Sequence, residues 1–495
     1  MSRQPETPRR GLWRAEIVRA VLSGHSILGI AFAAAIYLVC LSGTLSVFMR
    51  DFQGWEQPDA PWLDAVADRS VARAVASMGA RAGADRPIYV TLPSADLPRL
   101  MLSTGDEDGG ETWYADARGK LAVQAHAPWT DFIVDLHTRL HLPETWGRFL
   151  VGLTGVALLS SLISGVLAHP RVFRDAFHLR LGGSRRLEQA DLHDRLGIWP
   201  LPFHVIVSLT GALLGLSTVI VGVLALLLFR GDATKVYALL APPRPVADAR
   251  PAAPPDIAAI LAIARARVPD AVPQQLTVTH WGRRDLRIEL SAARPRLIAQ
   301  QDSFSFDAAG RIVAEKHPAD HNAGERILGS LGPLHFGWFG GLPVRLAYGA
   351  LGLALCVVTS SGVNVWLARR LDKGRAAPIW ERVWAAVCWG QPAAFSLAAL
   401  VAIVGALQVD ARRLTLLWLF ATIASLLGVV LVRVEASRVA NLTRRSTGGL
   451  LIATGASYLV TRVPQGKPAV LMLTLVILTI GLGMLALARR PLRRQ

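Results

Sequence analysis

Two copies of one short pattern, His25-Ser-Ile-Leu-Gly-Ile30 and His193-Asp-Arg-Leu-Gly-Ile198, each open a long apolar run. Each run then reaches a pair of small residues at the same spacing from its histidine, Ser42-Gly43 in the first copy and Thr210-Gly211 in the second. Patterns that recur at corresponding places indicate a duplicated structural unit.

A second pattern repeats in the same order. Leu136-His137 and Leu334-His335 each precede another apolar run, and the apolar cores of these runs end at Ser164-Gly165 and Ser361-Gly362. The repeated unit is therefore a span, a polar segment and a second span. Both copies run in the same direction, so we expect a pseudo-twofold axis along the membrane normal.

The composition identifies the apolar runs as membrane spans. Apolar residues make up 52% of the 495 residues and charged residues only 18%, whereas a soluble chain carries about a quarter charged residues. A helix needs ~20 apolar residues to cross the hydrocarbon core of a bilayer. The net charge of +17 comes from arginines at the ends of these runs, which is the pattern that orients a chain in lipid. This distribution indicates membrane lipid as a partner and argues against nucleic acid.

We expect eight spans, at residues 24–48, 147–169, 196–229, 343–368, 383–408, 414–432, 448–461 and 469–488. Arginine clusters precede the first span and follow the second, fourth, sixth and eighth, so they share one side if every span crosses. Only Arg412-Arg413 is discordant. The sequence therefore predicts a multi-pass protein of the bacterial inner (cytoplasmic) membrane with both termini in the cytoplasm.

The expected organisation follows from these spans. A cytoplasmic N-terminus (1–23) leads to a first repeat (24–169) with a polar lobe at 50–135; a cytoplasmic loop (170–192) leads to a second repeat (193–370) with a lobe at 230–333, and a four-span extension (371–495) closes the chain. Each lobe has one helix-like stretch before its strand-like stretches. In the first lobe the helix-like stretch is Val71–Ala84, and the strand-like stretches are Ile88–Leu92, Leu97–Ser103 and Thr112–Ala117. In the second lobe the helix-like stretch is Pro255–Val268, and the strand-like stretches are Gln275–His280, Asp285–Ser291 and Ser303–Asp307.

Alternating apolar residues and the turns Asp116–Gly119 and Asp307–Gly310 predict short antiparallel sheets in these lobes. The expected fold class is a membrane all-α bundle of about eight transmembrane helices. It is built on a duplicated helix–lobe–helix unit, with two small α+β lobes in the periplasm.

Four histidines occupy equivalent places in the duplicated unit. His25 and His193 are mates at the cytoplasmic end, and His137 and His335 are mates at the outer end. An axis along the membrane normal makes mates face each other at one depth, and two facing imidazoles in a helix bundle are what a haem iron needs as axial ligands. Zinc is the competing chemistry, but its usual Cys and clustered carboxylate partners are missing from this set. The three cysteines all lie in apolar runs, so redox chemistry requires a bound cofactor.

Three further histidines are candidate cofactor-binding residues. His141 follows His137 by four residues and would share its helical face, so it can replace or support that ligand. His204 lies inside the third span, on the same face as His193. His169 ends the second span, where an interfacial role is an equal alternative.

The chain resembles the PepSY-associated transmembrane proteins, which are often iron-regulated and include bacterial ferric-siderophore reductases. The resemblance rests on the His25 motif, on Leu136-His-Thr-Arg-Leu-His-Leu-Pro143, on Ser164-Gly-Val-Leu-Ala-His-Pro-Arg-Val-Phe-Arg-Asp175, on Asp191-Leu-His193 with Leu201-Pro-Phe-His204, and on Leu334-His-Phe-Gly-Trp-Phe-Gly-Gly341. It covers residues from about 15 to 370. Ser26-Ile27 departs from the usual His-Arg-Trp start. The resemblance implies PepSY-like outer lobes, two haems b held by the motif histidines, and reduction of iron chelates in the periplasm.

The expected activity is therefore that of an oxidoreductase of the ferric-chelate reductase type. A cytoplasmic or quinol donor would supply electrons, and a ferric siderophore or another Fe(III) chelate would accept them for iron uptake. Two alternatives remain open from the sequence: a membrane transporter, and a PepSY-type binding or regulatory protein in which the histidines have no redox role.

Overall fold

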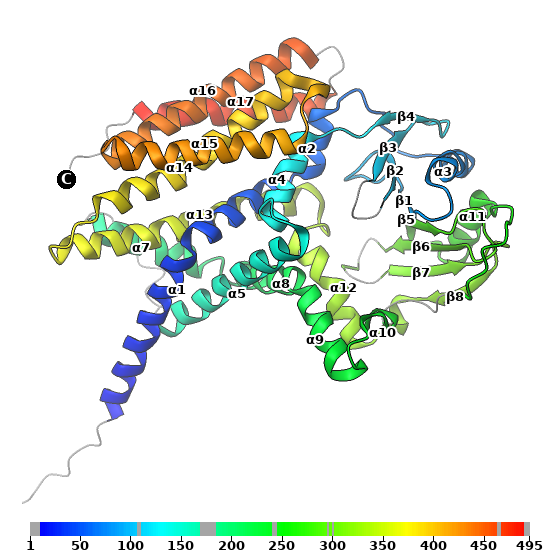
Figure 1. Ribbon diagram of the computed structural model, residues 1–495, viewed down its shortest axis with the longest axis horizontal. Helices are drawn as coiled ribbons and strands as arrows, with labels where there is room; N and C mark the ends of the chain where they lie inside the picture. Colours follow the sequence, from blue (N-terminus) through cyan, green and yellow to red (C-terminus); the bar gives the residue numbers. More distant parts are fainter. Residues whose placement is uncertain are drawn as a thin grey trace, which may run out of the picture.

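A bundle of long helices lies beside one antiparallel sheet in the computed structural model (Figure 1). The structure describes residues 10–105, 110–168, 185–239, 245–294, 297–298, 301–462 and 467–489. Residues 106–109 of the first lobe, His169 and most of the loop 170–192 lie outside the described residues. We call the end of the bundle that carries the sheet the lobe side, and the opposite end the distal side.

Six segments in the described chain are long and apolar enough to cross a membrane. They belong to helices α1 (Arg10–Ser46), α5 (Glu144–Ala168), α13 (Gly341–Asp372), α14 (Pro378–Gly405), α15 (Ala411–Leu431) and α17 (Pro468–Arg489). Helix α16 (Ala436–Arg462) covers the predicted span 448–461 and is longer, but it is not among the six. The count of eight spans stays a prediction.

The predicted third span, 196–229, is wrong as one continuous helix. Helices α7 (Arg185–Ile198) and α8 (Leu201–Gly215) meet at an angle of 70°, and α9 (Ser217–Phe229) begins after a further break. Pro200 stands at the bend. Proline has no N–H to donate and its ring clashes with the preceding turn, so it kinks or breaks a helix. Counted as one span, α7 with α8 gives a seventh crossing.

Five of these helices form a closed ring in which α7 and α8 together make one side. Helix α1 packs on α5 and α13, α5 packs on α8, and α13 packs on α7, so α1 lies diagonally opposite α7 and α8. Two shorter helices, α4 (Pro128–Arg139) and α12 (Ala323–Phe336), pack against the ring at its lobe side. Helices α14–α17 form a separate layer against α13, α4 and α2 (Met49–Glu56).

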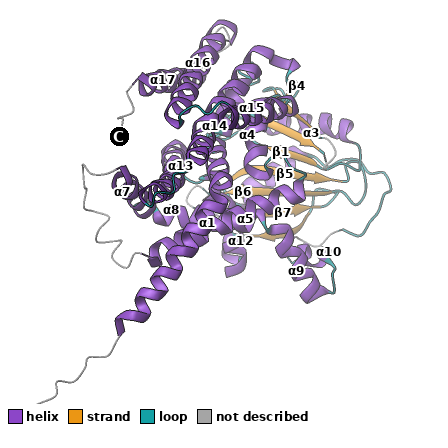
Figure 2. Ribbon diagram, turned by 60° about the vertical axis from the view of Figure 1, so that its left-hand side comes forward, coloured by secondary structure: helices purple, strands orange, loops and turns teal. Residues whose placement is uncertain are grey.

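The two lobes share a single sheet of eight strands, which appears as one layer beside the helices in Figure 2. The strands are β1 (Ile88–Thr91), β2 (Leu100–Thr104), β3 (Glu111–Ala115), β4 (Leu121–Gln124), β5 (Val272–Thr279), β6 (Arg287–Ala293), β7 (Gln301–Phe306) and β8 (Ile312–Lys316). Their order is β4-β3-β2-β1-β5-β6-β7-β8, entirely antiparallel. The expectation of two separate sheets is therefore wrong. Pairing β1 with β5 removes two exposed edges, each of which would otherwise present unpaired backbone groups.

One hydrophobic core serves both lobes. Helices α3 (Asp68–Ala82) and α11 (Ile257–Arg267) pack on each other and on the sheet, and the buried Met78, Leu261, Ile88 and Val278 belong to the same cluster. The small helix α10 (Ala233–Ala238) follows α9 before this region. Both predicted turns are confirmed, because Gly119 and Gly310 adopt positive φ and donate to Asp116 and Asp307. The short strands β4 and β8 after these turns were missed.

Candidate functional site

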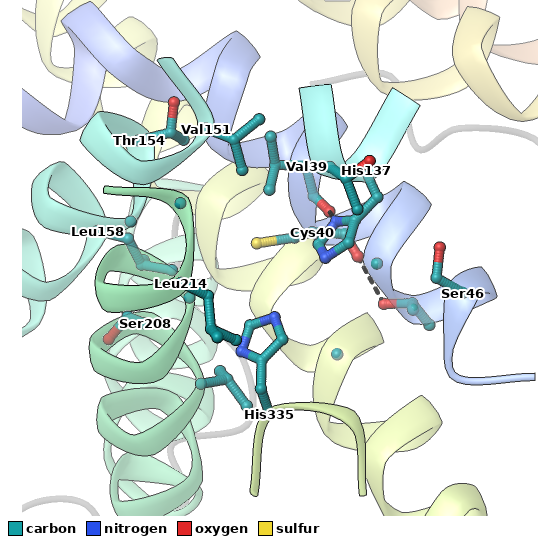
Figure 3. Close-up of a pocket in the computed structure, with 18 of the residues that line it drawn as sticks. Val39, Cys40, Ser46, His137, Val151, Thr154, Leu158, Ser208, Leu214 and His335 are labelled. Carbon is teal, nitrogen blue, oxygen red and sulfur yellow. Dashed lines mark hydrogen bonds between the residues drawn. The ribbon is translucent and has the colours of Figure 1, made fainter. Parts of the chain in front are cut away.

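The structure brings the four repeated histidines together as two pairs. His25 on α1 faces His193 on α7, with ring centroids 6.1 Å apart, and both line a cavity of about 260 Å³. His137 on α4 faces His335 on α12 at 6.0 Å, and both line a cavity of about 590 Å³. Figure 3 shows these last two rings projecting into the same cavity. We call them the distal pair and the lobe-side pair.

The spacing within each pair fits two ligands on opposite sides of one metal ion. An imidazole nitrogen binds a metal at ~2 Å, which places the centroids of two opposed rings about 6 Å apart. The angle between the ring planes, 71° in the distal pair and 17° in the lobe-side pair, is not restricted, because each ring can rotate about its bond to the metal.

The Nδ1 atoms of all four rings are already engaged. His25, His137 and His193 place Nδ1 at 2.9, 3.0 and 2.8 Å from the carbonyls of Ser161, Val39 and Val358. A carbonyl only accepts, so Nδ1 carries the proton and Nε2 keeps the lone pair that ligates a metal.

His335 reaches the same state through a hydroxyl. Its Nδ1 lies 3.0 Å from Oγ1 of Thr210, and that hydroxyl donates its own proton to the carbonyl of Ile206. Nδ1–H of His335 therefore donates to Thr210. Burial lowers the pKa of both His137 and His335, which keeps these two rings in the neutral, ligating form.

The repeated small-residue pairs make room for these rings. A methyl group added to Gly43 would lie 2.6 Å from His137, and one on Gly211 would lie 2.8 Å from His335. The corresponding distances are 3.0 Å from Gly362 to His193 and 3.3 Å from Gly165 to His25. Each histidine thus enters the ring of helices against a glycine of its own repeat. The sequence pattern located these pairs, but this steric role was missed.

Buried polar contacts hold the helices that carry the lobe-side pair. The Glu56 carboxylate, from α2, accepts from the backbone N–H groups of Trp129 and Thr130 at the start of α4 and from the Thr130 hydroxyl. It satisfies N–H groups that a helix start leaves open. Burial raises the pKa of Glu56 to about 7. Asn322 and Glu325 form a capping box at the start of α12. The role of Glu56 was also missed, because nothing in its local sequence marks it.

The other predicted histidines lie outside both pairs. His141 leaves the lobe-side cavity: its Nδ1 is 3.2 Å from the Thr415 hydroxyl of α15, and its ring packs on Phe132 and Trp418. Its proposed replacement of His137 therefore has no geometric support. His204 is fully buried on α8 but lines neither cavity.

Haem fits this set of residues better than a protein-bound ion. The described residues contain no group of three or more His, Cys, Asp or Glu side chains that could hold a metal, whereas a zinc site takes three or four protein ligands. Each pair offers two opposed imidazoles, which is what haem iron takes from a protein. The cavity walls are mostly apolar side chains such as Val151 and Leu214, as expected for a cofactor site.

The chain also resembles known sequences. The family described as PepSY-associated TM region matches residues 22–369, a range that contains both histidine pairs and the shared sheet. An uncharacterized protein of Pseudomonas aeruginosa is 33% identical over 282 residues, which cover 54% of this chain and 71% of that relative. The chain therefore belongs to the family of membrane proteins with a PepSY-associated transmembrane region.

Proposed function

We propose that this protein carries electrons across the bacterial inner membrane and reduces ferric siderophores or other Fe(III) chelates in the periplasm. The observation that carries the proposal is the presence of two opposed histidine pairs in one ring of helices. Gly43, which touches the lobe-side pair, follows His25 of the distal pair by eighteen residues of α1, or about 27 Å of helix. The pairs thus lie near opposite faces of a hydrocarbon core that is ~30 Å thick.

His25 and His193 would hold one haem b, and His137 and His335 would hold the other. The bound haem supplies a one-electron Fe(III)/Fe(II) couple at each pair. The carbonyls of Ser161, Val39 and Val358 orient the ligating rings. Ile36 and Leu158 line both cavities and so separate the two sites with apolar side chains.

The orientation follows from the arginine clusters, which favour a cytoplasmic distal side and a periplasmic lobe side. A cytoplasmic or quinol donor would then act at the distal pair, and the Fe(III) chelate would accept electrons near the lobe-side pair. Oxygen donors hold Fe(III) more tightly than Fe(II), so reduction loosens the chelate.

We also infer that the chain arose by duplication. Two observations support this inference: the histidine–glycine contacts match between the two halves, and strands β1–β4 and β5–β8 run outward in the same order from the β1–β5 join.

The test begins with the purified full-length protein. It should carry about two low-spin haems per chain, become reduced by dithionite, and return to the oxidised spectrum when an Fe(III) chelate is added without oxygen. A ferrous-specific dye should then trap Fe(II). A colourless but folded protein, produced with haem available, would contradict the proposal.

Single and double variants test the pairing. His25→Ala and His193→Ala should remove the same spectral component, because either change would remove one of the two histidines that would hold that haem. His137→Ala and His335→Ala should remove the other component. Combining changes within a pair should add little, whereas combining across pairs should remove both. Each variant must stay monodisperse, since loss of both components from a single change would report unfolding. A component shared by His25 and His335 would refute the pairing.

A further inference from the structure

A short stack of side chains connects the lobe-side pair to the protein surface. His335 meets Phe336 edge-on, with ring centroids 5.3 Å apart, and Phe336 stacks on Trp338 at 4.3 Å with an interplanar angle of 19°. The Arg50 guanidinium lies over the Trp338 ring, 5.1 Å from its centroid. Phe336 lines the lobe-side cavity, and Trp338 is 41% exposed. We call Phe336, Trp338 and Arg50 the exit stack.

The local backbone builds this stack. Helix α12 ends at Gly337, whose φ of 71° lies in the left-handed region, so the chain reverses and returns Trp338 onto Phe336. A side chain at Gly337 would also approach the Tyr348 ring to 3.2 Å. The Tyr348 hydroxyl donates to the carbonyl of Leu334 and fixes the end of α12 beside the cavity. The stack is thus a built feature of the turn and needs glycine at this position.

The first repeat is built differently at the same place. Thr138 follows His137 where Phe336 follows His335, and its hydroxyl bonds back to the carbonyl of Val134. The chain beyond it runs beneath α15, where His141 contacts Thr415 and Trp418. The C-terminal helices therefore cover the route outward from His137, whereas the route outward from His335 remains open at Trp338.

Arg50 is half-buried beside the open route and stands outside the ion pairs there. Arg345 pairs with both Asp51 and Asp96. Among the described residues, Arg50 makes no ion pair within 4 Å, although these two carboxylates lie near it. A guanidinium that stacks on a ring keeps its N–H groups at the edge and can donate them to anionic oxygens. Hydroxamate and catecholate ligands of Fe(III) present such oxygens.

We propose that the exit stack is the docking point for the Fe(III) chelate and the place where the electron leaves the protein. This inference rests on the proposed function. Arg50 binds the anionic oxygens of the chelate, and Trp338 and Phe336 fill the space between the chelate and His335. One electron passes from the reduced lobe-side site to Fe(III), which becomes Fe(II). No covalent bond changes in the protein, and protons from water neutralise the oxygens that the iron releases.

The experiment measures reoxidation of the dithionite-reduced, full-length protein by a ferric trihydroxamate chelate in an anaerobic stopped-flow instrument. Trp338→Leu and Arg50→Gln should each lower the second-order rate constant by roughly tenfold, the effect of losing one favourable stacking or charged contact. Arg50→Lys should recover only part of the rate, because an ammonium ion lacks the planar fork. Haem content and the reduced spectrum should stay as in the parent protein.

Two controls separate docking from damage. Trp146→Leu removes another exposed tryptophan, 68% exposed near the start of α5, and should leave the rate unchanged. Oxygen, a small neutral oxidant, should reoxidise all variants at the parent rate. Equal rate constants for the parent, Trp338→Leu and Arg50→Gln would overturn the docking inference and leave the proposed function standing. A loss of rate in Trp146→Leu as large as that in Trp338→Leu would do the same. A parent protein that binds haem but is not reoxidised by the chelate would overturn the proposed function as well.

Discussion

At the scale of single residues, the glycines beside the histidines allow a graded test. Gly43→Ala should displace His137, because the new methyl group would lie 2.6 Å from its ring, and Gly211→Ala should displace His335 almost as strongly. Gly165→Ala, with 3.3 Å available, should have the smallest effect. Loss of the spectral component of the affected pair, measured by reduced-minus-oxidised absorbance, reports the displacement.

The same helix provides the control for Gly43→Ala. A methyl group on Gly24 of α1 would meet nothing within 4 Å, and Gly24 lines neither cavity. Gly24→Ala should therefore keep both spectral components and gain about 0.5–1 kcal/mol of helix stability. If Gly24→Ala and Gly43→Ala behave alike, the glycines serve helix packing in general and do not make space for the ligands.

The repeated pattern in the sequence predicted which histidines face each other, because equivalent positions of a duplicated unit would meet across its axis. It did not identify what holds them. The carbonyl of Val39 and the carboxylate of Glu56 act on His137 and on α4 from other elements of the fold. Such contacts depend on three-dimensional packing, and no local pattern in a single sequence encodes them.

At the scale of one element, Glu56 should control the position of α4. Glu56→Ala removes the acceptor of two backbone N–H groups and one hydroxyl, a loss worth about 0.5–2 kcal/mol at a helix start. The spectrum of the lobe-side site should shift or weaken, because His137 lies on α4. The distal site is the internal control and should be unchanged. Equal damage to both sites would show that Glu56 stabilises the whole bundle instead.

The end of the sheet should respond to pH through His317. Its Nδ1 lies 2.7 Å from the buried Asp302, and its Nε2 lies 2.9 Å from Glu315. The hydrogen bond to Asp302, aided by Glu315, raises the pKa of His317 above its usual 6.5. The stabilisation that protonated His317 gives to the folded sheet is complete below the pKa of this histidine in the unfolded chain. It is lost as pH rises through the higher pKa of His317 in the folded protein. Hydrogen exchange of β7 and β8 should therefore quicken over this range, beyond the intrinsic change.

His317→Gln provides the comparison for that measurement. The variant should lose the additional pH dependence in β7 and β8, while β1 and β2 behave alike in both proteins. A variant that keeps the full dependence would assign it to another group.

Elements with a strong local pattern were predictable, and interrupted ones were not. The first strands of each lobe and both turns were found, because alternation and Asp–Gly spacing are local. The break in the third span was hidden inside a continuous apolar run, although Pro200 marked it. Residue-by-residue hydropathy does not distinguish one long helix from α7, α8 and α9 joined by bends.

At the scale of the whole molecule, the shared sheet restricts the topology. Strands β1 and β5 pair along their length, with Val90 opposite Leu276, so residues 88–124 and 272–316 must lie on one side of the membrane. The sequence could not reveal this join, because either lobe could bury its own edge strand. The join excludes an inverted second repeat, which would have placed the lobes on opposite sides and separated the histidine mates.

The last prediction concerns sidedness and the eighth span. Reporters inserted near Gly109 and Asp320 should both be periplasmic, and one near Gly182 should be cytoplasmic, since α5 lies between the first lobe and that loop.

The position of a reporter after Gln495 depends on α16. This helix carries Arg438, Arg444 and Arg445 in its first half, and Arg444 lies 3.9 Å from the centroid of the Trp389 ring of α14. If its arginines sit at the cytoplasmic end and its apolar half crosses, Gln495 is cytoplasmic and a reporter near Gln465 is periplasmic. If α16 stays at one surface, the reporters near Gln465 and Gln495 exchange sides. A periplasmic Gln495 with a cytoplasmic Gln465 would therefore reduce the number of crossings to seven and would leave both histidine pairs where they are.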